Sequence, residues 1–406
     1  MIKRVAYLSF HTSPLSRPGT GNAGGMNVYV DELARTMAGR GIEVDVFTRR
    51  CDPSSPAIVD VVEGYRVVEI EAGPTLPLPV RQLTDHVFDF AEEVIGWATS
   101  EDRNYDLVHS HYWLSGWAGL MVKRVLDIPL ANSFHTLGRV KDLTKRDDEP
   151  PAALLRIAAE IDVIGGSDCV ISSTPVEFDD LLEHYGADPA RLCLNPPGIN
   201  HELFKPGDLR ASRTAVGVDP MRDVVLFVGR IQALKGIDVA LEAFAKVAQE
   251  RSDVDLLVVG GPSGEAGEEE YEAAHHRVAE LGIEGRVMWR APVEHRELAS
   301  FYQAANLLLL PSRSESFGLV AVEAQACGVP VIASAIGGLS FAVANDTSGV
   351  LIDGWEPGDY AGAMIDLLAD PQKRASFCDA AIAHAEKFSW TITANRLLEL
   401  YAGITS

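Results

Sequence analysis

Short apolar runs that alternate with amphipathic stretches organise this chain. Residues 5–10, 43–48 and 128–134 predict buried parallel strands, and the stretches between them repeat apolar residues at helical spacing. Turn residues cluster between 195 and 207, where the apolar pattern lapses, and the same rhythm restarts at 224–228. The pattern predicts an α/β protein with two doubly wound, Rossmann-like domains that face a central cleft.

The lapse of the pattern predicts where the domains divide. We expect an N-terminal domain over residues 1–200 and a C-terminal domain over 201–383. The last stretch, 384–406, is amphipathic and predicts a helix that packs back on the N-terminal domain. Within the first domain, residues 26–39 and 81–100 each predict one continuous helix.

Composition narrows the class of partner. The 406 residues carry a formal net charge of −23, which argues against nucleic acid or an anionic membrane surface as the main partner. No apolar run approaches the ~18 residues of a membrane span, and the N-terminus enters a strand directly without a signal peptide. We therefore expect a cytoplasmic protein without stable membrane insertion. The five cysteines are scattered, so we expect reduced, packed thiols and no zinc site.

A literal G-x-G-x-x-G at residues 19–24 raises a dinucleotide site. In that fold the first glycine follows the strand almost at once and an acidic residue ends the second strand. Here a long loop precedes Gly19, and the second strand ends in Phe47-Thr48-Arg49. The dinucleotide interpretation is therefore the weaker one, although Gly24-Gly25 still favours close approach of a ligand to the backbone.

Two further motifs suggest metal ligands. His109-x-His111 has no acidic partner in its motif, so we favour polar lining of the cleft over a metal site. Asp253-x-Asp255 precedes a strand and should lie at the amino-terminal edge of the sheet, away from ligands. We expect no metal site at either motif.

The most informative stretch spans residues 307–338. An apolar strand, a polar loop, a helical repeat over 317–326 and a second apolar strand follow one another, with Glu315 and Glu323 inside the unit. If the eight residues between the two carboxylates were helical, they would span about 12 Å, the distance from the sugar to the ribose of a nucleotide-sugar. The helix N-terminus would then face a diphosphate. The alternative is an ordinary αβ unit with two solvated glutamates.

Longer motifs favour the nucleotide-sugar. The chain contains VGR-x4-KG, then GGP, then ESFG-x4-E, and its first domain contains HTSPLSRPGTGNAGGMNVYV and SHYWLSG. On these motifs it resembles the family 4 retaining glycosyltransferases of GT-B fold over nearly its whole length. Within that family it is similar to the branch that acts on D-inositol 3-phosphate in mycothiol biosynthesis. The resemblance implies transfer of N-acetylglucosamine from UDP-GlcNAc to 1D-myo-inositol 3-phosphate.

The resemblance also implies roles at the donor site. Arg230 and Lys235 would clamp the diphosphate and neutralise the leaving group, where a guanidinium and an ammonium suit phosphate oxygens. The remaining donor roles fall to Glu323 for the ribose hydroxyls, Glu315 with the N–H groups of Phe317 and Gly318 for the sugar hydroxyls, His135 beside the transferred sugar, and His11 and Gly25 along the diphosphate.

For the acceptor, the resemblance assigns the phosphate to Tyr112, Thr136 and Arg156, and the ring to the loop that contains Asn27. One departure concerns a lysine that the resembled enzymes carry after AGP. Val80 occupies that position here, with Arg81 beside it, and we expect Arg81 to restore the phosphate contact. The acceptor and the donor sugar stay open for this reason.

No cofactor is expected, because the nucleotide-sugar is a substrate; a divalent cation such as Mg²⁺ is compatible with binding but not required for catalysis. The partners are the two small-molecule substrates, and the oligomeric state, a homodimer included, is left open. The main alternative is a related enzyme that uses another sugar phosphate, as a sucrose-phosphate synthase does. A lipid-acceptor transferase, a non-catalytic nucleotide-sugar binder and an NAD-dependent enzyme are weaker alternatives.

Overall fold

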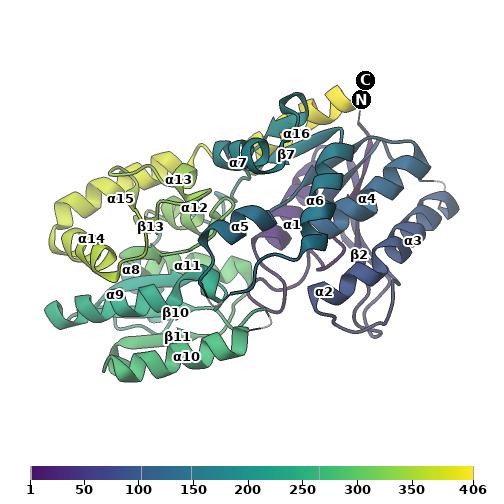
Figure 1. Cartoon of the computed structure of the whole chain (residues 1–406). Helices are drawn as coiled ribbons and strands as arrows, with labels where there is room; N and C mark the ends of the chain where they lie inside the picture. Colours follow the sequence, from purple (N-terminus) through teal and green to yellow (C-terminus); the bar gives the residue numbers. More distant parts are fainter. Residues whose placement is uncertain (1, 102, 148, 265, 406) are drawn as a thin grey trace.

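The computed structural model describes residues 2–101, 103–147, 149–264 and 266–405. These residues form two α/β domains that lie side by side, one in the purple-to-teal half of the chain and one in the green-to-yellow half (Figure 1). Each domain is built on a single sheet with helices on both faces. No helix among these residues is long and apolar enough to cross a membrane.

The first sheet has the strand order β3-β4-β2-β1-β5-β6-β7-β8 and is parallel except for the antiparallel pair β3 and β4. Its strands are β1 (Arg4–Leu8), β2 (Glu43–Arg49), β3 (Ile58–Val62), β4 (Tyr65–Ile70), β5 (Leu107–His111), β6 (Leu130–Ser133), β7 (Cys169–Ser172) and β8 (Leu192–Leu194). The helices around it are α1 (Gly25–Ala38), α2 (Val80–Leu83), η1 (Thr84–His86), α3 (Val87–Ser100), α4 (Trp113–Leu126), α5 (Gly138–Thr144), α6 (Leu154–Gly166), α7 (Pro175–Tyr185) and η2 (Pro189–Arg191).

The second sheet is parallel and has the order β11-β10-β9-β12-β13-β14. Its strands are β9 (Asp223–Val228), β10 (Val254–Val259), β11 (Val287–Arg290), β12 (Leu307–Leu310), β13 (Val331–Ser334) and β14 (Gly349–Ile352). The helices of this half are α8 (Leu209–Ala215), η3 (Ala233–Lys235), α9 (Ile237–Glu250), α10 (Gly267–Glu280), η4 (Glu284–Arg286), η5 (His295–Glu297), α11 (Leu298–Ala304), α12 (Leu319–Ala326), α13 (Leu339–Ala342), α14 (Pro357–Ala369), α15 (Pro371–Ala385) and α16 (Trp390–Ile404).

Alternation along the strands divides the core of each domain into two layers. In β1, Ala6 and Leu8 belong to the cluster on one face, whereas Val5 and Tyr7 belong to the cluster on the other. Both faces of a parallel sheet are covered by helices, so most of its strands are largely apolar. This explains why continuous apolar runs, rather than alternating ones, predicted most of the strands.

The last helix, α16, leaves the second domain and packs against α1 of the first (Figure 1). Its apolar face, which includes Trp390, Leu397 and Tyr401, shares one buried cluster with Ile2 at the start of the chain. The two ends of the chain therefore meet on the N-terminal domain, and the backbone crosses between the domains twice.

Two expectations from the sequence need correction, and one strand was not predicted. The single helix over 81–100 is interrupted at His86, whose backbone leaves helical geometry at φ −115° and ψ 7°. Strand β3 is an edge strand that the apolar pattern missed, because its residues are exposed or only half-buried. Helix α12 starts at Leu319 rather than at 317, since Gly318 has a φ of +95°. The estimate of about 12 Å between the two carboxylates therefore treated the residues from Glu315 to Gly318 as helical, whereas they form a loop.

The cysteines also differ from expectation. Cys169 and Cys193 are joined as a disulfide, whereas Cys51, Cys327 and Cys378 are free. The two partners lie on the adjacent strands β7 and β8 with 6.3 Å between their Cα atoms, within the range that a disulfide bridges. The prediction of five thiols was wrong for this pair because strand adjacency is not visible in residues 24 positions apart.

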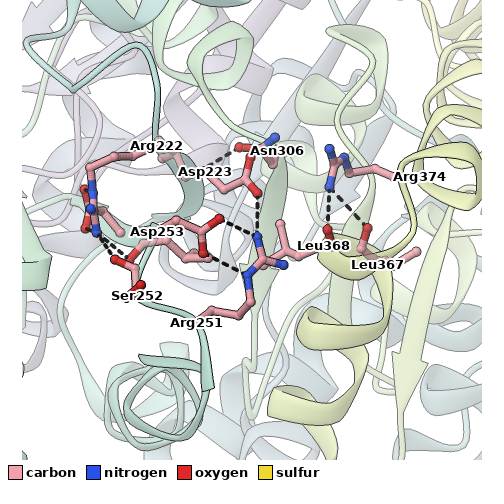
Figure 2. A network of polar contacts seen from close by, with 12 residues as sticks. Arg222, Asp223, Arg251, Ser252, Asp253, Asn306, Leu367, Leu368 and Arg374 are labelled. Carbon is pink, nitrogen blue, oxygen red and sulfur yellow. Dashed lines mark hydrogen bonds and ion pairs between the residues drawn. The ribbon is translucent and has the colours of Figure 1, made fainter. Parts of the chain in front are cut away.

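The Asp253-x-Asp255 motif lies in a network of ion pairs at the amino-terminal edge of the second sheet. Figure 2 shows Arg251 between Asp223 and Asp253, with N–O distances of 3.2 and 2.8 Å. The hydrogen bonds from Arg251 hold the pKa of Asp253 at about 2. Asp255 pairs with Arg222 and Arg286. Both carboxylates are thus neutralised by arginines, and the motif has a structural role.

The two crossings between the domains touch each other at Gly198. A Cβ atom at Gly198 would lie 2.1 Å from the backbone nitrogen of Trp390. We expect Gly198→Ala to lower the free energy of unfolding by about 1–3 kcal/mol, because the backbone has to move. Thermal unfolding of the whole protein measures the loss. Gly285→Ala is the matched control, because no atom lies within 4 Å of its Cβ position; an equal effect of the two changes would contradict close packing at the crossing.

Candidate active site

A cavity of about 370 Å³ lies between the two sheets and is lined by residues of both domains. Its walls follow the carboxyl ends of the strands: His11 comes after β1, Tyr112 after β5, His135 after β6, Arg230 after β9 and Ser312 after β12. Ligands of open parallel sheets bind at this edge. The topology therefore brings residues that are far apart in the sequence to one place.

Most of the residues predicted from the sequence line this cavity. They are His11, Gly25, Tyr112, His135, Thr136, Arg230, Lys235, Glu315, Phe317, Gly318 and Glu323. Asn27, Arg81 and Arg156 are not among the lining residues.

The backbone is strained at two of the lining positions. Tyr112 has a φ of +79° and His135 a φ of +60°, a region that residues with a Cβ rarely occupy. The carbonyl of His135 accepts a hydrogen bond from the Ser316 hydroxyl of the other domain. Strain of this kind is retained where a side chain has to be presented in a fixed direction.

The two histidines of the H-x-H motif lie behind this wall instead of in it. His109 and His111 are fully buried, with ring centroids 4.2 Å apart, on the same face of β5. Nδ1 of His109 hydrogen-bonds with the Tyr401 hydroxyl at 2.6 Å, and Nδ1 of His111 with Nε2 of His135 at 3.1 Å. The prediction that the motif lines the cleft was therefore wrong: its strand continues to His111 and turns both rings into the core.

Burial keeps the histidines of this region neutral. It lowers the pKa of His135 to about 3, and burial together with His135, Arg230 and Arg156 lowers the pKa of His11 to about 3. The His11 ring stacks on Tyr112 with centroids 4.4 Å apart, and among the described residues its buried Nδ1 has no hydrogen-bond partner. These rings act as hydrogen-bonding groups, and not as cations, at neutral pH.

The wall formed by the second domain has a pair of opposite charges and a further cation. Nζ of Lys235 lies 2.5 Å from Oε2 of Glu315, and both side chains are about one-fifth exposed. Arg230 is half-buried nearby, and burial lowers its pKa while Glu315 raises it. The ion pair holds the two side chains in place, and an anion that entered here would meet two cations and one carboxylate.

On the same wall, Glu323 lies almost entirely buried at 3% exposure on α12. Its Oε1 lies 2.6 Å from Nε2 of His295, and its Oε2 accepts a hydrogen bond of 2.8 Å from the Tyr302 hydroxyl. Both His295 and Glu323 face the cavity. Sequence reasoning missed His295, which follows a loop after β11 and belongs to no motif.

On the wall formed by the first domain, Arg156 on α6 organises the lining residues. Its Nη2 donates to the hydroxyl and the carbonyl of Thr136 at 3.1 Å, and its Nε donates to the buried Glu160 at 2.8 Å. The guanidinium also lies 5.4 Å from the centre of the Tyr112 ring. Arg156 thus contacts Thr136 and Tyr112, the two lining residues assigned to the acceptor, from the side away from the cavity.

The other acceptor residues lie elsewhere. Asn27 is buried and holds the loop before α1: its Nδ2 donates to Thr12 and Ser13, and its Oδ1 accepts from the Gly24 N–H. Arg81 is exposed, and Val80 takes the place on the cavity wall. The structure therefore does not place Arg81 among the residues that line the cavity, because α2 turns the Val80 side chain toward the cavity instead.

A lysine not singled out from the sequence lines the cavity instead. Lys141 on α5 is half-buried, and burial, then repulsion by Arg156, lowers its pKa. It has no ion pair among the described side chains. The sequence predicts a loop of mixed charge at this position. Nothing in the sequence therefore distinguishes Lys141 from the other charged residues of that segment.

Side chains join the domains around the cavity mouth. Arg17 pairs with Glu294 at 2.6 Å, Arg146 pairs with Glu270, and the Ser263 hydroxyl donates to the Gly21 carbonyl at 2.7 Å. No group of three or more His, Cys, Asp or Glu residues in the described ranges could hold a metal ion. The site is thus an interdomain cavity that is lined by cations, carboxylates and imidazoles.

Comparison with known proteins agrees with this architecture. A family model for Glycosyltransferase Family 4 matches residues 23–203, and one for Glycosyl transferases group 1 matches residues 210–384. D-inositol 3-phosphate glycosyltransferase 2 of Catenulispora acidiphila is 46% identical over 98% of this chain and 95% of its own length. D-inositol 3-phosphate glycosyltransferase of Kribbella flavida is 42% identical over 100% and 96%. Sucrose-phosphate synthase of Thermosynechococcus elongatus is 31% identical and matches with a TM-score of 0.92 over 99% and 98% of the two chains.

Two Rossmann-like domains around one cavity, with these matches, define a GT-B glycosyltransferase. The chain belongs to the family 4 glycosyltransferases, and it is similar over nearly its whole length to members named D-inositol 3-phosphate glycosyltransferase. The fold class predicted from the apolar pattern and the family predicted from the motifs are both confirmed.

Proposed function

We propose that this enzyme transfers N-acetylglucosamine from UDP-GlcNAc to the hydroxyl of a phosphorylated polyol, 1D-myo-inositol 3-phosphate, with retention of the anomeric configuration. The observation that carries the proposal is the polarity of the cavity. Lys235, Arg230 and the carboxylates Glu315 and Glu323 line the cavity from the second domain, and Lys141, with Arg156 behind Thr136, belongs to the first. Each domain thus offers cations to one of two anionic substrates, which can meet between the two walls.

On the donor side, the diphosphate is assigned to Arg230 and Lys235. As the bond from the sugar to the leaving phosphate breaks, negative charge grows on the phosphate, and two fixed cations stabilise it in a site shielded from water. Glu315 is then free to exchange Lys235 for hydroxyls of the transferred sugar, together with the N–H groups of Phe317 and Gly318. Glu323 accepts hydrogen bonds from the ribose hydroxyls.

Retention follows if the leaving phosphate itself takes the proton of the attacking hydroxyl on the same face of the sugar. No side chain has to act as a nucleophile, so catalysis consists of positioning and charge stabilisation. His135 and His11, which burial keeps neutral, would donate hydrogen bonds at the reacting centre without adding charge. No cofactor takes part in the reaction.

The acceptor is the second element of the proposal. Relatives named D-inositol 3-phosphate glycosyltransferase support an inositol phosphate. A second candidate is a sugar phosphate such as fructose 6-phosphate, because Val80 stands where the resembled enzymes carry a lysine and the sucrose-phosphate synthase has a TM-score of 0.92 to this chain. Both candidates place a phosphate at the wall of the first domain, beside Arg156 and Lys141.

The deciding experiment measures UDP release from UDP-GlcNAc in three parallel reactions, with inositol 3-phosphate, with fructose 6-phosphate and without acceptor. We expect stimulation by inositol 3-phosphate alone. Stimulation by fructose 6-phosphate alone would reject the inositol acceptor and keep the mechanism. A parallel series with UDP-glucose identifies the donor sugar, and a lack of release with every donor and acceptor would reject the proposed reaction.

A further inference from the structure

The carboxylate of Glu323 is held by two donors from different elements. Nε2 of His295, at the start of η5, lies 2.6 Å from one oxygen, and the Tyr302 hydroxyl, on α11, lies 2.8 Å from the other. The Glu323 side chain is only 4% exposed and that of His295 19%, yet both line the cavity. The ring of Phe204 packs on His295 with centroids 5.1 Å apart, which fixes the orientation of the imidazole.

This arrangement leaves acceptor capacity on Glu323. A carboxylate offers about four lone-pair positions, and His295 and Tyr302 occupy one on each oxygen. The two that remain can accept hydrogen bonds from a pair of adjacent hydroxyls.

The charges around His295 favour its protonated form. Burial lowers its pKa, but the Glu323 carboxylate on α12, with Glu32 and Asp31 on α1 of the other domain, raises it by more, so the net shift is upward. Burial in turn raises the pKa of Glu32, and Arg35 on the same helix pairs with Asp31. Among the described residues, Tyr302 and Cys327 are the other titratable groups near the carboxylate, and burial together with Glu323 raises the pKa of the Cys327 thiol. An imidazolium hydrogen-bonded to Glu323 thus serves as the counter-ion of the buried carboxylate.

We propose that His295 is a positioning residue for nucleotide recognition: as the hydrogen-bonded counter-ion of Glu323, it keeps that carboxylate turned toward the adjacent hydroxyls of the donor's ribose. The inference rests on the proposed function, in which Glu323 binds the ribose of a uridine diphosphate sugar. It adds a residue outside the family motifs and makes donor binding dependent on pH. As pH rises through the raised pKa of His295, the counter-ion is lost and donor binding weakens.

Calorimetric titration of the whole protein with UDP and with 2′-deoxy-UDP tests this over roughly pH 6 to 8, where histidines titrate. The two ligands share the same diphosphate, so the ratio of their dissociation constants isolates the ribose contact. We expect this ratio to favour UDP at low pH and to shrink as pH rises. His295→Ala should weaken UDP binding about tenfold, with a much smaller effect on 2′-deoxy-UDP.

Three further variants separate positioning from mere structure. His295→Gln keeps an N–H donor but cannot titrate, so its ratio should not change with pH. Tyr302→Phe should weaken UDP binding at every pH and retain the pH dependence. His276→Ala, at an exposed position on α10 outside the cavity, should behave as the wild type.

The outcomes separate the role of His295 from the assignment of the donor site. A His295→Ala variant that binds UDP and keeps the wild-type preference over 2′-deoxy-UDP would overturn the role of His295 and leave the proposed function intact. A pH-dependent ratio in His295→Gln would do the same. A wild-type protein that does not bind UDP would overturn the donor assignment, and the role of His295 with it.

Discussion

Lys235→Ala should reduce kcat about 100-fold or more, the usual cost of removing one electrostatic donor from a site that stabilises developing charge. The structure adds a second reason for a large effect. Lys235 lies 2.5 Å from Glu315, so its loss leaves an unpaired carboxylate next to the position assigned to the diphosphate. Repulsion from that carboxylate acts on the leaving group just as its charge increases. Initial rates of UDP release at saturating donor and acceptor measure kcat.

The matched control is Lys246→Ala, an exposed lysine on the neighbouring helix α9 that should leave kcat unchanged. The double variant Lys235→Ala with Glu315→Gln separates the two causes, because the glutamine removes the repulsion without restoring the cation. Partial recovery of kcat in the double variant would assign part of the loss to Glu315. Turnover of Lys235→Ala near the wild-type value would contradict a role at the diphosphate.

The location of Lys235 and Glu315 at the cavity could be predicted from the sequence, whereas that of His295 could not. The first two lie in motifs that combine a strand end, a tight turn and a charged residue, so their position follows from local geometry and the parallel-sheet rule. His295 reaches Glu323 from 28 positions away in the sequence, through a loop that has no periodic pattern. The same limit applies to Lys141, because only the packing of α5 against the cavity separates it from other charged residues of its loop.

The acceptor residues show a second reason why the sequence did not predict the whole site. The type of a residue does not reveal which hydrogen-bond partner its side chain has in the folded protein. Asn27 could contact a ligand or its own loop with equal chemistry, and the structure shows that all its hydrogen bonds go to the loop. His109 and His111 have a spacing that suits a polar wall, yet the strand buries both rings. The fold class and the positions of most strands follow from the apolar pattern, whereas such choices depend on tertiary contacts.

Arg156→Ala is expected to raise the KM for the phosphorylated acceptor about 10- to 100-fold, as loss of a charge-assisted hydrogen bond does, and to change the KM for the donor little. The reason lies in its position: the guanidinium binds Thr136 and stacks near Tyr112, the two lining residues assigned to the phosphate. The measurement compares both KM values in the variant and in Arg124→Ala, an exposed arginine on α4 that should not affect either.

The ion pair between Arg156 and Glu160 makes a structural role the alternative explanation. Glu160 is fully buried and accepts hydrogen bonds from the Gly138 N–H and the Tyr185 hydroxyl, so Arg156→Ala leaves it without its counter-ion. If that were the whole effect, both KM values would change together with a lower melting temperature, and Glu160→Gln, combined with Arg156→Ala, would restore them. If Arg156 instead supports binding of the phosphate, the KM for the acceptor stays high in the double variant. Inhibition by unphosphorylated inositol is then the same in the wild type and in both variants, because only binding of the phosphate depends on Arg156.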